Sequence, residues 1–566
     1  MASDVMTALL KEEDTDGDKK ITILDKGDKV FVFQGKQITG TYYLSNLLQE
    51  LALHHKVNLS RVKENPLDRV SRMIREEYWD GLTRVIDKEH LKEIIPDTKV
   101  KTDALYLYVP ENDSFDSVSG VIIKRLPPAP GPKYVHDLNG KHGLLALAKN
   151  APYVVPGGRF NEMYGWDSYF ESIGLMLDQR PELVDGMVKN FTYEITHYGK
   201  ILNANRTYYL NRSQPPFFTS MILLQKNRDK AAIAAAIQEY ETVWMGPDRL
   251  TATGLSRYHG KGLGVPPEVE TGHYLTVFEP YAKKLGMKAN AYQEKYDRGE
   301  IRNPELDTFF EHDACVRESG HDTTYRFRYN GKDACADFVT VDLNTLLYKI
   351  ELDLAELVPE KRTYFRERAQ KRKELIMKYL WDEKTGYFFD YHVPSGTRSS
   401  YISATGLYPL MIKEKLLSKE EAKRAIAFGL KHLEGPGGIF STAKVSRESV
   451  KDSHERQWDW PNGWAPHQMI IWQGLLNYDK GEDAERLISK WILMIAENAR
   501  DFNGTVPEKF DVEKRSHAVF AEYGNVGTHF SYITKEGFGW MNASYQYGLH
   551  LLPEKKKNEL RKKLIR

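Results

Sequence analysis

The sequence predicts a mainly α-helical protein, built as a barrel of paired helices that carries its site in the connecting loops. Three observations lead to this fold class. Apolar residues recur at helical spacing in most segments after about residue 47. Segments with the alternation of a strand are few and short, and long loops rich in glycine, proline and aromatic residues separate the helices. No residue-level repeat indicates a solenoid.

The expected elements follow in chain order. Two alternating apolar pieces, ITI at 21–23 and VFVF at 30–33, predict short strands near the start of the chain. The stretch GYFFDYHV at 386–393 predicts another strand. Helical spacing is clearest at 41–55, 65–87, 88–95, 180–199, 339–358, 360–382, 418–433 and 482–501. We therefore divide the chain into an N-terminal region, 1–46, and a helical domain, 47–566.

Composition narrows the class of partner. The 566 residues include 80 Lys and Arg against 79 Asp and Glu, so no long-range field attracts a polyanion and no nucleic-acid partner is expected. No apolar run reaches the roughly 18 residues that span a bilayer, so we expect no membrane insertion. Two cysteines and the absence of a signal-peptide pattern predict a cytoplasmic protein.

An acidic loop near the N-terminus has the ligand spacing of an EF-hand. The first, third, fifth, ninth and twelfth positions of its twelve-residue window are Asp14, Asp16, Asp18, Thr22 and Asp25. Lys20, at the seventh, would contribute its backbone carbonyl. Three features depart from the EF-hand: Lys19 stands where the turn needs glycine, the twelfth ligand is the shorter Asp25, and a strand is expected to follow. We expect a structural or regulatory Ca²⁺ ion; the alternative is a solvated acidic turn.

Six stretches combine aromatic rings with carboxylates, amides and arginines. A neutral polyhydroxylated ligand needs this mixture, because polar groups hold its hydroxyls while rings cover its apolar faces. Hydrolysis of a glycosidic bond needs two carboxyl groups and no metal. No HExxH, GxSxG, phosphate loop or CxxC pair indicates other chemistry. The stretches are 153–170, 199–217, 257–268, 315–327, 456–468, and 506–511 with 536–540.

Two of these stretches carry a family resemblance. PGGRFNEMYGWDSYF (156–170) and QWDWPNGWAP (457–466) resemble the signature stretches of trehalases, a family of glycoside hydrolases. ILNANRTYYLNRSQPP, ESGHD, PEKFD and EGFGW match as well, so the resemblance covers about residues 47 to 555. The acidic loop resembles the calcium loop of fungal neutral trehalases. The resemblance implies an (α/α)6 barrel that hydrolyses α,α-trehalose to two glucose molecules with inversion.

The resemblance also implies roles for single residues. The general acid falls on Asp322 and the general base on Glu508, although Phe510 replaces a tyrosine often found there. The calcium ligands map onto the window above, with Asp14, Asp16, Asp18, Lys20 and Asp25. Substrate contacts map onto Arg159, Trp166, Asp167, Asn203, Arg212, Ser213, Gln214, Glu268, Arg317 and Gly320.

Several neighbouring residues have a structural alternative. Asp167 and Asp459 could serve as helix caps or loop braces rather than ligands. The histidine beside the expected acid, His321, is more simply a packed neighbour, and Glu522 could position water or only brace its loop. The tryptophans that could belong to the core are Trp458, Trp460 and Trp464.

Two other functions compete with trehalose hydrolysis. One is another inverting α/α-barrel glycosidase, of the glucoamylase or mannosylglycerate type, which needs the same carboxylates but not both signature stretches. The other is a calcium-dependent trehalose sensor without catalysis. Regulation by 14-3-3 proteins, which fungal relatives receive through a phosphorylated N-terminal segment, is not expected, because only 13 residues precede the acidic loop and they contain no Arg-x-x-Ser.

Overall fold

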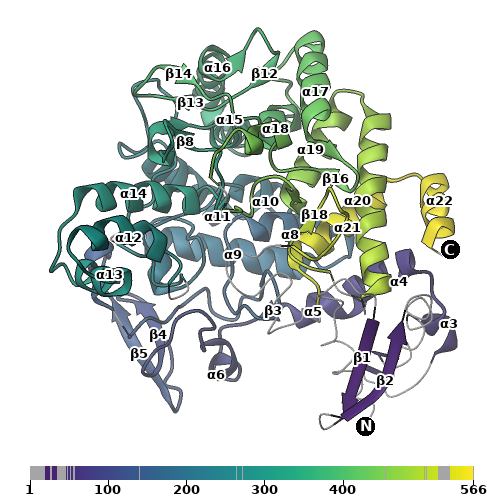
Figure 1. Cartoon of the computed structure of the whole chain (residues 1–566), viewed down its shortest axis with the longest axis horizontal. Helices are drawn as coiled ribbons and strands as arrows, with labels where there is room; N and C mark the ends of the chain where they lie inside the picture. Colours follow the sequence, from purple (N-terminus) through teal and green to yellow (C-terminus); the bar gives the residue numbers. More distant parts are fainter. Residues whose placement is uncertain are drawn as a thin grey trace.

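Six helices form a closed inner ring in the part of the chain that the structure describes (Figure 1). Each contacts the next in chain order, and the last, α21, packs against the first, α8. The ring consists of α8 (Asp167–Leu177), α10 (Phe218–Leu224), α15 (Val341–Leu357), the 3-10 helix η6 (Ala404–Met411), α19 (Ala465–Asn477) and α21 (Gly539–Leu551).

An outer helix covers each inner one. Five of them directly follow their inner partners along the chain, whereas α4 comes from the beginning of the chain and packs on α21 near its end. This pairing completes the expected (α/α)6 barrel. The outer helices are α9 (Pro181–Tyr198), α11 (Lys230–Glu239), α16 (Arg362–Tyr379), α17 (Lys419–Leu433), α20 (Gly481–Asp501) and α4 (Pro66–Met73).

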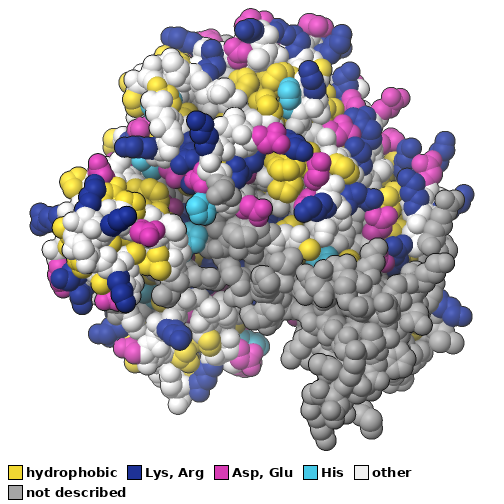
Figure 2. Space-filling model, in the orientation of Figure 1, with side chains coloured by type: hydrophobic (Ala, Val, Ile, Leu, Met, Phe, Trp, Pro, Cys, Tyr) yellow, Lys and Arg dark blue, Asp and Glu magenta, His cyan; other side chains and the backbone are white. Residues whose placement is uncertain are grey.

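This is a computed structural model. It describes residues 42, 46, 49–50, 53–54, 58–138, 140–262, 264–269, 272–452, 454–502, 504, 506–519 and 536–564, and the backbone of the two N-terminal strands. None of the helices in this part of the chain has the length and apolarity to span a bilayer. On the face shown in Figure 2, positive and negative side chains are interspersed over the described surface, in keeping with the near-zero net charge.

Local sequence explains where the outer helices begin and end. Helix α9 starts with Pro181 at its first position and ends at Gly199, whose φ of 80° closes the helix in the left-handed region. Helix α17 begins with a capping box between Ser418 and Glu421. In α20, residues at helical spacing, from Ala484 to Ala499, are buried against the inner ring.

The N- and C-terminal ends of the helical domain are tied together by hydrogen bonds. Tyr545 on α21 donates to the backbone carbonyl of Leu67 on α4 over 2.9 Å, and Ser71 donates to Gln546 over 2.6 Å. The basic helix α22 (Glu554–Leu564) also packs on α4 and α20, and its Arg561 pairs with Asp68. The barrel therefore closes only when both ends of the domain are folded.

Strands are short and lie in the loops. β1 (Lys20–Asp25) and β2 (Asp28–Gln34) form an antiparallel hairpin, which confirms the two predicted N-terminal strands. The single strand predicted at 386–393 is divided into β12 (Tyr387–Phe388) and β13 (Tyr391–His392), which belong to different sheets. A three-stranded parallel sheet has the order β5 (Val121–Leu126), β4 (Leu105–Pro110), β6 (Leu144–Leu145).

One predicted helix ends too late. The helix expected at 65–87 is continuous only through α4, the π-turn η1 (Ile74–Tyr78) and α5 (Trp79–Gly81). Thr83 and Arg84 instead form β3, which pairs with β7 (Tyr153–Val154). A partner strand 70 residues away is invisible to local periodicity. The helix expected at 88–95 is reduced to α6 (Leu91–Ile94), and most of 41–55 lies outside the described residues.

A smaller helical unit stands beside the barrel. α12 (Leu275–Lys284), α13 (Ala289–Asp297) and the first part of α14 (Pro304–Glu318) bury an aromatic core of their own, which includes Phe278 and Phe310. Figure 1 shows this unit at the left edge of the molecule. Because α14 runs from it into the barrel, the unit fixes the direction from which the 317–322 segment enters the site.

The remaining described elements connect these parts. They are α3 (Leu59–Val62), α7 (Pro132–Asp137), η2 (Thr207–Tyr209), η3 (Tyr240–Trp244), β8 (Arg328–Tyr329), β9 (Lys332–Asp333), η4 (Cys335–Asp337), β10 (Phe338–Val339), η5 (Pro359–Lys361), β11 (Trp381–Asp382), β14 (Thr397–Arg398), β15 (Glu434–Gly435), β16 (Gly438–Ile439), α18 (Lys444–Glu448), β17 (Asn462–Gly463) and β18 (Phe510–Asp511). Cys315 and Cys335 are buried free thiols.

Candidate active site

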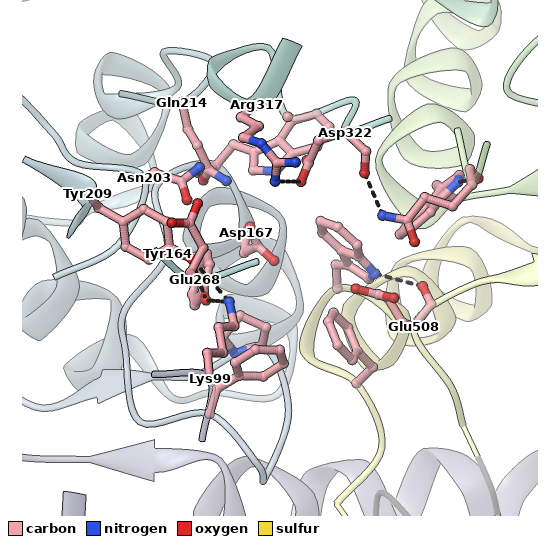
Figure 3. Close-up of a pocket in the computed structure, with 18 of the residues that line it drawn as sticks. Lys99, Tyr164, Asp167, Asn203, Tyr209, Gln214, Glu268, Arg317, Asp322 and Glu508 are labelled. Carbon is pink, nitrogen blue, oxygen red and sulfur yellow. Dashed lines mark hydrogen bonds and ion pairs between the residues drawn. The ribbon is translucent and has the colours of Figure 1, made fainter. Parts of the chain in front are cut away.

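One pocket at an end of the barrel gathers residues from all six stretches that the sequence singled out (Figure 3). Both expected catalytic carboxylates, Asp322 and Glu508, line it. Nine of the ten expected substrate contacts line it as well. Besides these, the lining consists of Thr98, Lys99, Pro156, Phe160, Tyr164, Tyr209, Gln457, Trp458, Trp464, Phe538 and Trp540.

The buried carboxylate of Glu318 holds loops from the first half of the chain in place around this pocket. Glu318, at the end of α14, is fully buried and accepts hydrogen bonds from the backbone N–H groups of Ser213 (3.0 Å) and His259 (2.6 Å). Arg249 also donates to it over 2.5 Å. The glutamate of the ESGHD motif therefore joins three loops, and its position decides where the next four residues enter the pocket.

The polar wall of the pocket consists of Asp167, Asn203, Arg212, Gln214, Glu268 and Arg317. Its side chains are held before any ligand arrives. Arg212 donates to Glu268 over 2.5 Å, both being almost fully buried, and the Gln214 amide oxygen accepts from the backbone N–H of Trp166 over 3.0 Å. Burial alone would raise the pKa of Glu268, but Arg212 and Arg317 outweigh it and hold that pKa below its ordinary value.

Arg317 connects this wall to the general-acid position. It donates through Nε to Asp313 over 2.7 Å and through Nη2 to the Tyr274 hydroxyl over 2.6 Å. Its Nη1 lies 3.9 Å from Asp322 Oδ2, and the Asp322 side chain is 30% exposed. Gly320 has a φ of 74°, and a Cβ there would lie 2.9 Å from the Trp166 ring. Glycine is thus required for the chain to pass Trp166 and present Asp322.

Glu508 stands on the opposite side of the pocket, on a loop that the second signature stretch supports. β17 pairs with β18, so that Asn462 lies opposite Asp511 and Gly463 opposite Phe510. The Trp540 indole donates to the backbone carbonyl of Glu508 over 2.9 Å. The Glu508 side chain is 17% exposed, with Oε2 lying 3.4 Å from the Lys509 ammonium.

The aromatic wall consists of Trp458, Trp464, Phe538 and Trp540. Trp458 and Trp464 stack with centroids 3.9 Å apart and planes 4° from parallel, while Trp540 meets both edge-on. Both stacked rings are buried and still line the pocket. The wall is therefore part of the core and part of the site at once, a combination that suits a sugar face.

Comparisons with known proteins agree with this geometry. The family model described as Trehalase matches residues 53–553. The chain belongs to the trehalase family. A second model, described as the neutral trehalase Ca²⁺-binding domain, matches residues 6–33. Family membership makes the protein an enzyme, a glycoside hydrolase of the trehalase type.

Fungal trehalases are similar over nearly the whole chain. The cytosolic neutral trehalase of Neurospora crassa is 42% identical, with 97% of this chain and 84% of that protein covered. The Saccharomyces cerevisiae cytosolic neutral trehalase is also 42% identical, with 96% and 82% covered. The solved structure of neutral trehalase Nth1 from Saccharomyces cerevisiae superimposes with a TM-score of 0.79 at 40% identity, covering 88% of this chain and 96% of that one.

One of the ten expected substrate contacts does not line the pocket. This residue is Ser213. Its hydroxyl donates to the backbone carbonyl of Ile201 over 2.6 Å, and its N–H is held by Glu318. Because a loop of alternating residues turns every second side chain inward, Arg212 and Gln214 reach the pocket while Ser213 braces the loop.

Some of the residues for which a structural role was the alternative do not line the pocket. Asp459 is a loop brace, fully buried, accepting from Thr324, the Tyr325 N–H and Tyr401 over 2.8–2.9 Å. Trp460 is half-buried and lies outside the pocket lining. Glu522 lies outside the described residues, as do Asp14, Asp16 and Asp18 of the calcium loop; Lys20 and Asp25 are the first and last residues of β1.

Asp167 is both a helix-start residue and a pocket residue. It is the first residue of α8 and is almost fully buried. Burial, and then the charges of Glu508 and Asp322, raises the pKa of Asp167 well above its ordinary value. Glu171, one turn further along α8, is also buried with a strongly raised pKa, and among the described residues neither of its oxygens has a hydrogen-bond partner.

Sequence reasoning missed Lys99. It comes from the loop between α6 and β4, which lies outside every aromatic stretch, and its ammonium donates to the hydroxyls of Tyr164 (2.8 Å) and Tyr209 (3.0 Å) at the pocket (Figure 3). Phe160 completes an aromatic cage around it, with the ring centroid 5.2 Å from Nζ. Nothing in the local sequence marks this lysine, because its partners lie 65 and 110 residues away.

Proposed function

We propose that this enzyme hydrolyses α,α-trehalose to two glucose molecules with inversion, using Asp322 as general acid and Glu508 as general base. The observation that carries the proposal is the placement of these two carboxyl groups on one pocket, which has a polar wall on one side and an aromatic wall on the other. A neutral disaccharide requires both kinds of wall.

The reaction follows from the two roles. Asp322 gives its proton to the glycosidic oxygen as the bond between that oxygen and the anomeric carbon breaks. Glu508 takes a proton from a water molecule, whose oxygen attacks the anomeric carbon from the opposite face. One glucose leaves with the original α configuration and the other carries the new hydroxyl in the β configuration. The proton on Glu508 then returns the pair to its starting state through solvent.

The remaining pocket residues hold the sugars. Arg212, Gln214 and Asn203 present fixed donors and acceptors to hydroxyl groups, and the indole faces cover the apolar side of a ring. Lys99 adds a donor that no motif predicted. Burial raises the pKa of Asp167 well above its ordinary value, which favours the protonated form, and a protonated carboxyl group can donate to a sugar hydroxyl as well as accept from one.

The test separates catalysis from binding. Wild type, Asp322→Asn and Glu508→Gln are incubated with trehalose, and the anomers are followed by proton NMR in the first seconds. We expect equal α- and β-glucose from wild type and a loss of at least about 100-fold in kcat for each variant. Release of α-glucose alone would contradict inversion. Trehalose binding without hydrolysis by wild type would favour the sensor, and hydrolysis of a different glycoside in preference to trehalose would favour another inverting glycosidase.

We further propose that the matched calcium-binding segment holds a structural or regulatory Ca²⁺ ion through Asp14, Asp16, Asp18, the Lys20 carbonyl and Asp25. The match of residues 6–33 and the oxygen-rich ligand set support this. We expect chelation to lower the melting temperature, and added Ca²⁺ to restore it. Asp16→Asn should weaken the Ca²⁺ response, whereas a melting temperature that ignores both chelator and ion would contradict the proposal.

Two observations support a cytosolic location. The similar fungal proteins are named cytosolic neutral trehalases, and the described part of the chain contains no membrane-spanning helix. We infer that this enzyme acts on trehalose in the same compartment. Fractionation of cells that express a tagged full chain tests this directly.

A further inference from the structure

The two catalytic loops are joined by a side-chain bridge that belongs to neither carboxylate. Gln457, from the second signature stretch, donates through Nε2 to the backbone carbonyl of Asp322 over 2.5 Å. On its other side, Gln457 Oε1 accepts from the Lys509 ammonium over 2.7 Å. Lys509 Nζ also lies 3.4 Å from Glu508 Oε2. These contacts therefore link the backbone of Asp322 to the side chain of Glu508.

Burial makes this bridge rigid. Gln457 is 5% exposed and Lys509 is fully buried. The Lys509 ammonium lies 4.8 Å from the centre of the Trp464 ring, and the Trp464 indole donates to the Gln457 backbone carbonyl over 3.0 Å. A buried ammonium is held where its hydrogen bonds and neighbouring charges are satisfied, because leaving it unpaired is costly. Its position is thus tied to Gln457 and Glu508.

The backbone reinforces each end. The N–H of Trp458 donates to the Thr323 carbonyl over 3.1 Å, next to the Gln457 contact with Asp322. At the other end, the pairing of β17 with β18 fixes the 510–511 segment to 462–463. Residues 456–464 therefore connect the loop of the general acid with the loop of the general base, and the Gln457 side chain contacts both loops.

We propose that Gln457 and Lys509 are positioning residues that set the separation between the general acid and the general base. This rests on the proposed function, in which Asp322 and Glu508 act as a pair across one bond. An inverting reaction needs the two carboxyl groups at a separation that leaves room for one water molecule, so a small shift of either loop misplaces the nucleophile. Substrate contacts on the polar wall do not pass through the bridge.

The geometry predicts a specific kinetic result. Gln457→Met removes both hydrogen bonds at similar side-chain length, and Lys509→Met removes the ammonium. Each is expected to lower kcat for trehalose by about 100-fold, since a misplacement near 1 Å costs that much, while KM changes less than about threefold. Gln457→Glu, which can still accept from Lys509 but cannot donate to Asp322, should lose activity like Gln457→Met.

A double variant tests whether the two residues act as one unit. If they form one bridge, Gln457→Met combined with Lys509→Met should cost no more in kcat than the worse single variant. Multiplied losses would show two independent effects and would overturn the proposal. So would a kcat within threefold of wild type in either folded single variant, or a loss that falls on KM alone.

Matched controls separate positioning from folding. Gln468→Met removes a fully buried amide on α19 that bonds both the N–H and the carbonyl of Ile439 and has no hydrogen bond to Asp322, Lys509 or Glu508 among the described contacts. Lys490 lies on the outer helix α20, and its ammonium donates to Glu434 and to the Gly435 carbonyl. Lys490→Met removes this ammonium. Both should lower the melting temperature and leave kcat within about twofold.

The outcomes also separate this inference from the proposed function. A wild type that releases no glucose from trehalose refutes the proposed function. An active wild type whose bridge variants stay active refutes only the bridge. Should Lys509→Met fail to fold, the Gln457→Met and Gln457→Glu pair decides the question, because the lysine and its charge remain: a kcat loss with unchanged KM supports the bridge, and retained kcat overturns it.

Discussion

The polar wall and the aromatic wall of the pocket are held in place by different forces. The polar wall depends on buried ion pairs and hydrogen bonds between distant segments, such as Arg212 with Glu268 and Arg317 with Asp313. The aromatic wall depends on ring packing, mostly within residues 458–464 and their contacts to Trp540. Loss of one charge should therefore damage the polar wall, whereas the aromatic wall should respond mainly to a loss of ring volume.

Buried groups near the pocket have pKa values that are shifted in opposite directions. Glu171 lies one turn beyond Asp167 on α8, and burial raises its pKa well above its ordinary value. Behind the aromatic wall, burial lowers the pKa of His321 to about 4, and that of His467, which stacks on it, well below its ordinary value. Each shift disfavours the charged form, so a fall in pH through the range of His321 and a rise in pH above the ordinary range of Glu171 both cost stability, for different reasons.

The largest effect on stability is expected from the polar wall. Glu268→Gln leaves the Arg212 guanidinium buried without its carboxylate, which should lower the free energy of unfolding by about 3–5 kcal/mol. Urea denaturation at pH 7 measures this. As a control, Lys133→Ala breaks a solvent-exposed pair with Asp137 and should give no measurable loss. Equal losses for the two variants would show that the buried Arg212–Glu268 pair contributes no more to stability than the exposed pair.

An intermediate effect is expected behind the aromatic wall. The unfolded chain takes up a proton at His321 below pH 6.5 while the folded protein does not until about pH 4, so stability is lost as pH falls through this range. A shift of this size corresponds to about 3 kcal/mol when complete. When the pH is lowered from 7.5 to 4.5, the free energy of unfolding of His321→Phe should therefore fall by about 2 kcal/mol less than that of wild type.

Urea midpoints at the two pH values check this expectation. His550→Phe, which replaces an exposed histidine on α21, serves as the control and should follow wild type at both pH values. If His321→Phe and wild type lost the same stability on acidification, the buried ring would not be the source of acid sensitivity.

The smallest effect is expected from Glu171. Its folded pKa is raised, so the unfolded chain ionises above pH 4.5 while the folded protein keeps the proton, and stability is lost as pH rises. Glu171→Met should stabilise the protein by about 1 kcal/mol at pH 8 and by less at pH 5. Melting curves at both pH values measure the gain; the exposed Glu367→Met should show none. A destabilised Glu171→Met would mean that the carboxyl group has a partner that matters.

Local patterns predicted much of this molecule because they act over short distances. Helical spacing located α9, α15, α16, α17 and α20, and period-two alternation located β1 and β2. They could not predict β3, since its partner β7 lies 70 residues on. The family resemblance implied Ser213 as a substrate contact, whereas the structure turns its hydroxyl toward the Ile201 carbonyl.

By itself, the sequence determined the chemistry available to this trehalase: a helical chain with paired carboxylates, amides, arginines and indoles in motifs that identify the family. Only the tertiary structure decided how those groups meet. Closure of α21 onto α8 and α4 brings Glu508 across from Asp322, and burial shifts the pKa of Asp167, Glu171 and His321. Contacts between segments far apart in the chain also bring Lys99 to the pocket and place Gln457 between the acid and the base. Desolvation and long-range contacts exist only in the folded chain, so no local pattern can carry them.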